Sequence, residues 1–189
     1  MHDLTSSPGL LATIGLPFSG KSTLARALAQ ALSAELVELD AMTGDGIADP
    51  DDASAWIERY HLAHVRIRSA LTRGEFVVFD AVNHRAHQRD RLRRLAAAAG
   101  TSARFVWLDV PAEVAPARLR RNWLSPTRQD VPEHGFSEIE DAFEPPDGET
   151  DVLVYDGLIP VARWVEDFAD ALLLRDDLRT DGGLAFRRC

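Results

Sequence analysis

Cysteine is almost absent from this sequence, because the only one is Cys189, the last of the 189 residues. A single thiol excludes an intrachain disulfide and a zinc site built from several cysteines. Long apolar runs are also missing, and the first ten residues lack the positively charged start of a signal peptide. We therefore expect a cytoplasmic protein with no membrane segment.

Lysine is just as scarce, because only Lys21 is a lysine among the 21 Lys and Arg residues. A chain that otherwise uses arginine has a compact ammonium at one place, and such a point charge suits phosphate chemistry. The formal net charge of −9 argues against a protein that coats long nucleic acid, since that binding requires a field of basic side chains.

Short apolar runs alternate with longer segments of helical periodicity, which predicts a single α/β domain with a parallel sheet covered on both faces. We expect five strands, at Leu10–Ile14, Leu36–Leu39, Phe76–Phe79, Phe105–Leu108 and Val152–Tyr155. We expect helices at 24–32, 53–71, 91–99, 112–122 and 161–174, and Pro116 could kink the fourth of these. In such a fold, ligands bind beyond the carboxyl ends of the strands.

Four prolines and many polar residues set residues 123–148 apart, with only a short helix expected over 137–143. We interpret this region as an active-site flap, so that a lid spans about residues 118–148 within a domain of residues 1–174. Residues 175–189 show little periodicity and are expected to form a loosely ordered tail.

The segment Gly15-Leu16-Pro17-Phe18-Ser19-Gly20-Lys21-Ser22 has the spacing of a P-loop, and it lies between a predicted strand and a predicted helix as that motif requires. Its glycines allow backbone N–H groups to point inward at phosphate oxygens, aided by the positive end of the helix dipole. We expect Lys21 to contact the β and γ phosphates of ATP and the Ser22 hydroxyl to bind Mg²⁺. The alternative is an ordinary glycine-rich turn.

Asp40 and Asp80 each end a predicted strand at the edge where ligands bind. One carboxylate can serve the metal and the other can accept a proton from a substrate hydroxyl. We assign Asp80 to magnesium, because it follows an all-apolar run, and Asp40 to the base. Either residue could instead end its strand or cap the next helix, and Asp109 is interpreted as a turn or cap residue.

Arginines near the flap are candidates to offset the charge that develops on the transferred phosphoryl group. Arg118 and Arg121 share one helix face and Arg128 lies in the flap, although a solvated helix face would also explain them. A wall for the acceptor is expected from the residues after Asp80, namely Asn83, His84, Arg85 and Arg89. Trp56, Tyr60 and Ile67 have the spacing of a buried helix face, which indicates core packing.

These residues resemble the P-loop kinase family that includes chloramphenicol phosphotransferase, zeta toxins and the kinase domain of polynucleotide kinase, together with bacterial AAA-type ATP-binding proteins. The resemblance covers most of the chain and rests on the stretch Gly15 to Thr23, Asp40, Phe79-Asp80-Ala81-Val82-Asn83, Arg118-Leu119-Arg120-Arg121-Asn122 and Phe143-Glu144-Pro145-Pro146. It implies a three-layer P-loop NTPase fold with strand order 2-3-1-4-5, the cofactors ATP and Mg²⁺, Asp40 as general base and lid arginines around ATP.

The expected activity is therefore transfer of the γ-phosphate of ATP to a hydroxyl of a small molecule. Thr43 stands where polynucleotide kinases and zeta toxins usually carry an arginine for an acceptor phosphate, which argues against a phosphate-bearing acceptor. Two alternatives stay open, a polynucleotide 5′-hydroxyl kinase and a regulatory ATP-binding protein without turnover. A GTPase is excluded because its Asn-Lys-x-Asp signature needs a second lysine. The pattern identifies neither the acceptor nor the oligomeric state.

Overall fold

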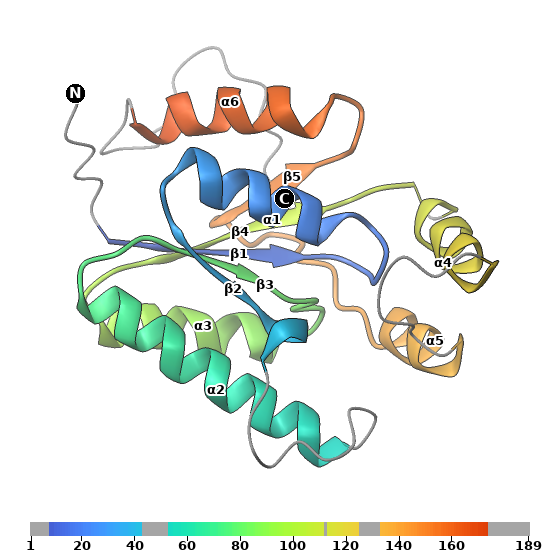
Figure 1. Ribbon diagram of the computed structural model, residues 1–189, viewed down its shortest axis with the longest axis horizontal. Coiled ribbons are helices and arrows are strands. Elements are labelled where there is room, and N and C mark those ends of the chain that lie inside the picture. The colour runs from blue at the N-terminus through green and yellow to red at the C-terminus, as the bar shows by residue number, and fades with distance from the viewer. Residues whose placement is uncertain (1–7, 43–52, 112, 125–132, 174–189) are drawn as a thin grey trace.

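Five parallel strands form the centre of the protein (Figure 1). The computed structural model describes residues 8–42, 53–111, 113–124 and 133–173. The strands lie in the order β2-β3-β1-β4-β5, which confirms the expected topology. They are β1 (Leu10–Ile14), β2 (Glu35–Glu38), β3 (Val77–Asp80), β4 (Ala103–Leu108) and β5 (Val152–Tyr155).

The predicted strands are all present, with ends that shift by one or two residues. Every residue of β1 and β3 is buried, because these strands have neighbours on both sides and helices on both faces. β4 begins earlier than its apolar run, since Ala103 and Arg104 pair with Leu10 and Leu11 of β1. Pairing with a neighbouring strand therefore extends β4 beyond the residues that its apolar pattern predicts.

Two layers of helices cover the sheet (Figure 1). On one face, α2 (Ala53–Thr72) and α3 (Ala86–Ala98) supply core residues such as Ile67 and Leu92. On the other, α1 (Lys21–Ala31) and α6 (Val161–Leu173) supply Leu24, Leu28 and Phe168. A short 3-10 helix, η1 (Leu39–Ala41), follows β2. The three layers leave the carboxyl edge of the sheet to loops.

Two further helices, α4 (Val114–Leu124) and α5 (Glu133–Asp141), lie to one side beyond the carboxyl edge of the sheet (Figure 1). α5 falls within the segment expected to form a lid, residues 118–148, and α4 overlaps its start. Pro116 lies in the first turn of α4, where its missing N–H needs no helical partner, so the expected kink has no cause.

Helix α3 begins at Ala86, five residues before the predicted start at Arg91. Its first turn carries no large apolar residue, so hydrophobic periodicity begins only at Leu92. The helix starts there because Ala86 N–H donates to a Glu144 carboxylate oxygen at 2.7 Å, and Arg85 N–H donates to the Gln88 side chain at 3.0 Å.

The expected tail, residues 175–189, lies outside the described residues. Within the described part of the chain, no helix combines the length and the hydropathy that crossing a bilayer requires.

Candidate active site

The loop between β1 and α1 has the backbone of a phosphate cradle. Gly20 adopts φ 111°, and a Cβ there would lie 3.3 Å from Nη1 of Arg118. Gly15 adopts φ 151°, and a Cβ there would lie 3.0 Å from the Ser19 Oγ. Phe18 also has a positive φ, of 64°. The glycines of the motif are therefore required by both conformation and space.

The cradle holds polar groups that fit phosphate oxygens. Lys21 is buried at the N-terminus of α1, and its Nζ donates to the Leu16 carbonyl at 2.7 Å. The Ser19 Oγ is buried without a hydrogen-bond partner among the described residues. A buried hydroxyl without a partner costs free energy, which a bound phosphate oxygen would offset. Half-buried Ser22 and exposed Thr23 follow in the first turn of α1.

Helix α4 is docked on this loop. Phe18 packs with Ala115 and Leu119 of α4 and with Phe136 of α5. Arg118 Nη1 donates to the carbonyls of Phe18 and Ser19, at 3.2 and 2.8 Å. Helices α4 and α5 therefore contact this loop through an apolar cluster, and α4 also contacts it through an arginine.

A cavity of about 670 Å³ lies beside the phosphate loop, between α4 and the loop that joins β5 to α6. Arg121 lines it together with Gly20, and Arg128 lies outside the described residues. The sequence interpretation missed its far wall, which consists of Tyr155, Asp156, Gly157 and Leu158. The sequence did carry a signal for this wall, namely Asp156-Gly157 directly after a predicted strand. Because the carboxyl ends of parallel strands meet at one edge, residues at that position are expected near the ligand site.

Asp80 ends β3 next to the strand that leads into the phosphate loop. The Thr13 hydroxyl donates to the Ala81 carbonyl at 2.9 Å and lies 3.4 Å from Asp80 Oδ1. Within the described residues there is no cluster of three metal-ligating side chains. Magnesium at phosphate sites usually takes one or two side chains, with phosphates and water completing its shell, so Asp80 and Ser22 form a chemically suitable pair.

Asp40 follows β2 in η1, and its side chain is exposed. Since Glu38 is in register with Asp80, both aspartates leave the sheet at the same edge on neighbouring strands. Arg59 of α2 is buried, and its Nη1 lies 3.4 Å from the Asp40 carbonyl. Burial, and then the charge of Asp40, raise the pKa of Tyr60 to about 12, so this phenol stays protonated beside the carboxylate.

The expected acceptor wall needs correction. Arg89 is 1% exposed and forms an ion pair with Glu149, so its side chain is turned into the protein and the prediction that it contacts an acceptor is wrong. Asn83 is also buried, and its amide donates to the Thr13 carbonyl at 2.8 Å. Arg85 is exposed at the start of α3.

A second cavity, of about 630 Å³, lies between α2 and α3. Its lining includes Trp56, Glu58, Tyr60, His61, His64, Asn83, His87, Gln88 and Arg91. Trp56 is 36% exposed, so its predicted place in the core is wrong, whereas Ile67 is fully buried. The difference has a physical reason: Ile67 packs against the sheet, whereas Trp56, in the first turns of α2, faces this cavity.

His64 forms the buried floor of this second cavity. It is 7% exposed, and its Nδ1 has no hydrogen-bond partner among the described residues. Burial, with smaller contributions from Arg91, His61 and Arg68, lowers the pKa of His64 to about 4. The imidazole is therefore neutral at ordinary pH.

A phosphate cradle at the end of the central strand of a 2-3-1-4-5 parallel sheet defines the P-loop kinase-like fold, and this chain has that fold. The family model AAA_33, described as an AAA domain, matches residues 10–146, so the chain belongs to this AAA domain family. A search of the curated proteins gives no significant match.

Solved structures share the fold over nearly the whole chain. A gluconokinase from Sinorhizobium meliloti 1021 is 24% identical, with a TM-score of 0.64 over 88% of this chain and 92% of that one. A putative kinase from Chloroflexus aurantiacus j-10-fl is 18% identical, with a TM-score of 0.70 over 87% and 98%. A shikimate kinase from Acinetobacter baumannii, in complex with shikimate, is 20% identical, with a TM-score of 0.58 over 93% and 98%.

Gly20→Ala should weaken ATP binding by roughly tenfold or more, because it combines strain at a positive φ with a contact to Arg118 in the cradle. Gly100→Ala is the matched control, since Gly100 also has a positive φ, of 77°, but open space for a Cβ. Titration calorimetry with ATP would measure both. Equal affinities for the two variants would contradict the role of the cradle.

Acid should destabilise the protein through His64. Its folded pKa of about 4 lies below the ordinary value of 6.5, so the unfolded chain binds more protons in this window. The contribution of His64 to the free energy of unfolding is therefore fully present above pH 6.5, and it is lost as the pH falls toward about 4. Urea unfolding at several pH values should show that the free energy of unfolding falls less with acid in His64→Leu than in the wild type. An equal dependence on pH in the two proteins would contradict this prediction.

Proposed function

We propose that the protein is an ATP-dependent kinase that transfers the γ-phosphoryl group of ATP to a hydroxyl of a small-molecule acceptor. The observation that carries the proposal is the cradle: the only lysine of the chain lies at the N-terminus of α1, and just before it lies a buried Ser19 hydroxyl with no hydrogen-bond partner among the described residues. Both groups suit a bound phosphate. The similarity of fold to a gluconokinase and a shikimate kinase agrees with this proposal.

Each residue of the site has a part in the proposed reaction. The loop from Gly15 to Ser22 and Lys21 hold and orient the phosphates. Asp40 accepts the proton of the acceptor hydroxyl, whose oxygen forms the new bond to the γ phosphorus while the bond to the ADP oxygen breaks. Arg118 and Arg121 offset charge on the transferred group and help to exclude water.

Ser22 and Asp80 would hold magnesium, which supplies charge neutralisation at the phosphates when bound. A hydroxyl and one carboxylate match the preference of this ion for oxygen ligands and its usual retention of several waters. We also propose that the enzyme acts in the cytoplasm, where ATP is available.

The acceptor is proposed to bind in the cavity between α2 and α3. This cavity shares Asn83 with the loop that follows Asp80, and Tyr60 in its lining lies near Asp40. Its volume of about 630 Å³ falls in the range of small-molecule sites. Aromatic and imidazole groups in its lining suit an uncharged or weakly charged molecule more than a polyphosphate.

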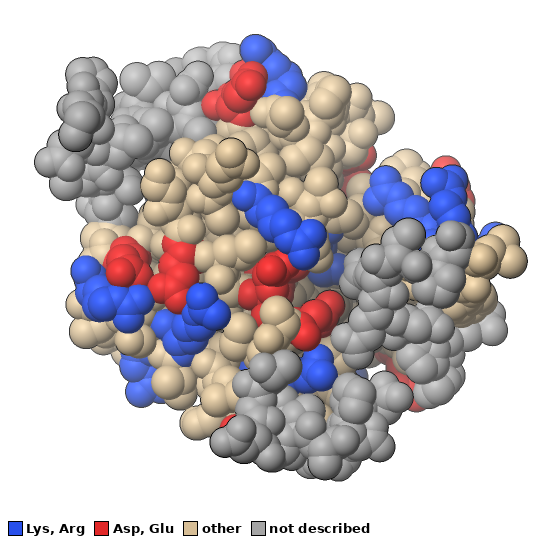
Figure 2. All heavy atoms as spheres, in the orientation of Figure 1, with Lys and Arg blue, Asp and Glu red and all other residues tan. Residues whose placement is uncertain are grey.

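The surface charge agrees with a small acceptor rather than a polynucleotide. Figure 2 shows basic and acidic side chains interspersed on one face of the described residues, with no continuous basic field. Arg73 with Glu35 and Glu75, and Arg26 with Glu38, form ion pairs on the surface. Paired arginines contribute little to the field that attracts a phosphate backbone.

Label transfer from γ-labelled ATP would test the activity. The purified protein, with Mg²⁺, should phosphorylate a member of a pool of small-molecule alcohols, and Lys21→Ala and Asp40→Asn should each reduce transfer by at least about a hundredfold. Transfer to 5′-hydroxyl oligonucleotides instead would support a polynucleotide kinase. ATP binding without transfer to any pool would support a regulatory protein and refute the assignment of Asp40 as a base.

Trp56→Ala should raise the KM of the identified acceptor by roughly tenfold and leave the KM of ATP unchanged, because Trp56 lines only the second cavity among those described. Val65→Ala is the matched control on α2, since Val65 is 48% exposed and does not line that cavity. Steady-state kinetics with each substrate varied in turn would separate the effects. A change in the KM of ATP alone would place the acceptor elsewhere.

A further inference from the structure

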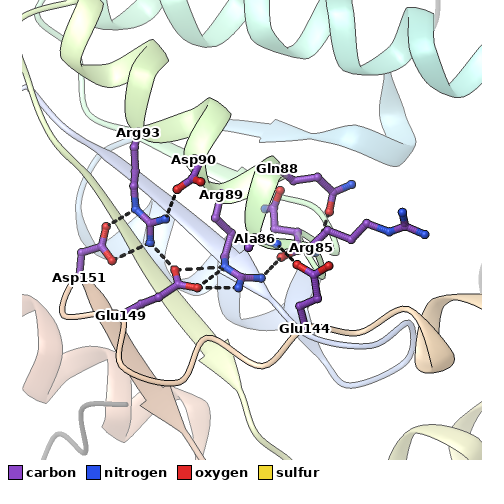
Figure 3. Close-up of polar contacts among 10 residues, drawn as sticks. Arg85, Ala86, Gln88, Arg89, Asp90, Arg93, Glu144, Glu149 and Asp151 are labelled. Carbon is purple, nitrogen blue, oxygen red and sulfur yellow. Dashed lines mark hydrogen bonds and ion pairs between the residues drawn. The ribbon is translucent and has the colours of Figure 1, made fainter.

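Arg89 is the most deeply buried charged side chain described, with 1% of its surface exposed. Its Nε and Nη2 donate to Glu149 Oε1 at 2.9 and 2.5 Å, and its Nη1 donates to the Asn83 carbonyl at 3.1 Å. Figure 3 shows the guanidinium between Glu149, from the loop before β5, and the start of α3. Each of its three nitrogens therefore has a partner.

The neighbouring Arg93 provides a comparison. It bonds Glu149, Asp151 and Asp90 on the outer side of the same cluster (Figure 3), and none of these bonds among the described residues reaches Asn83. Two arginines thus share Glu149, but only Arg89 extends from it to the loop after β3. The cluster joins the segment that follows the lid to the first turns of α3.

Burial of this ion pair is not explained by stability alone. Removing a guanidinium from water costs several kcal/mol, and apolar side chains of similar volume often stabilise a protein as well or better. Apolar replacements such as methionine at position 89 and leucine at position 149 could not supply the hydrogen bond to the Asn83 carbonyl. Asn83 has a φ of 45°, in the left-handed region that asparagine tolerates better than most residues, and the bond from Arg89 helps to hold this conformation.

Asn83 belongs to a loop that is bonded to the phosphate cradle. Its amide donates to the Thr13 carbonyl at 2.8 Å, and Gly15 N–H donates to the Val82 carbonyl at 3.1 Å. The Thr13 hydroxyl bonds Ala81 and lies next to Asp80. Residues 80–83 are therefore fixed to residues 13–15 on one side and to Arg89 on the other.

We propose that Arg89, held by Glu149, is a positioning residue that sets the Asp80 carboxylate relative to the phosphate loop. It touches neither nucleotide nor acceptor and acts through Asn83. This inference rests on the proposed function, since the carboxylate is positioned there to hold magnesium with the nucleotide.

The test compares variants that remove the link to Asn83 with one that leaves it in place. Arg89→Met combined with Glu149→Leu replaces the buried pair by apolar volume, and Arg89→Lys keeps the charge but loses the fork that reaches two partners. Arg93→Met is the matched control. The probe is the nonhydrolysable ATP analogue AMP-PNP, titrated by calorimetry with Mg²⁺ and again with EDTA, and thermal unfolding reports stability.

We expect Mg²⁺ to tighten AMP-PNP binding to the wild type and to Arg93→Met by the same factor. In Arg89→Lys and in the double variant that factor should fall by roughly tenfold, with little change in affinity in EDTA and with no relation to the change in Tm. If Mg²⁺ tightens AMP-PNP binding to either folded Arg89 variant by the same factor as in the wild type, the inference is overturned. A wild type that binds AMP-PNP equally with and without Mg²⁺ would also overturn it while nucleotide binding stands, whereas no binding at all would overturn the proposed function itself.

Discussion

The parallel pairing of β1 with β3 is the constraint on which the site depends. It brings the ends of the two strands to one edge, where Gly15 bonds Val82 and Asn83 bonds Thr13. The phosphate loop and the carboxylate of Asp80 then form one bonded unit instead of two adjacent loops. β2 adds Asp40 on one side, and β5 adds the wall of the cavity beside the phosphate loop on the other. The chemistry is thus assembled from four strand ends that the sheet aligns.

Arginine and lysine have separate uses in this chain. Arginine appears where a planar fork joins several oxygens, as at Arg89 with Glu149 and Asn83, or Arg73 with Glu35 and Glu75. Lysine appears only in the loop between β1 and α1, where a single flexible ammonium would suit the phosphate oxygens of the proposed nucleotide. The composition therefore reflects a difference in hydrogen-bond geometry, and the single lysine lies in the same loop as the glycine spacing of the motif.

Local pattern was sufficient to predict the five strands, their parallel arrangement and the phosphate loop, because each depends on residues that are adjacent in the chain. The burial of Arg89 was not predictable, since its partner Glu149 is 60 residues away. Trp56 was placed in the core because periodicity cannot show which turns of a helix lie over the sheet. The β5–α6 wall carries only the weak signal of Asp156-Gly157 at the end of a strand, and the strand order brings it beside the phosphate loop.

Two residues with positive φ flank the site, and an arginine Nη1 bonds the carbonyl of each: Arg118 on Phe18 at 3.2 Å and Arg89 on Asn83 at 3.1 Å. The two arginines differ in exposure. Arg118 is exposed on the lid, so it can exchange backbone carbonyls for phosphate oxygens, which bind a guanidinium more strongly. Arg89 is buried and paired with a carboxylate, so its bond to the Asn83 carbonyl is shielded from water. One arginine is therefore suited to respond to the nucleotide, and the other to keep Asp80 in place while it does.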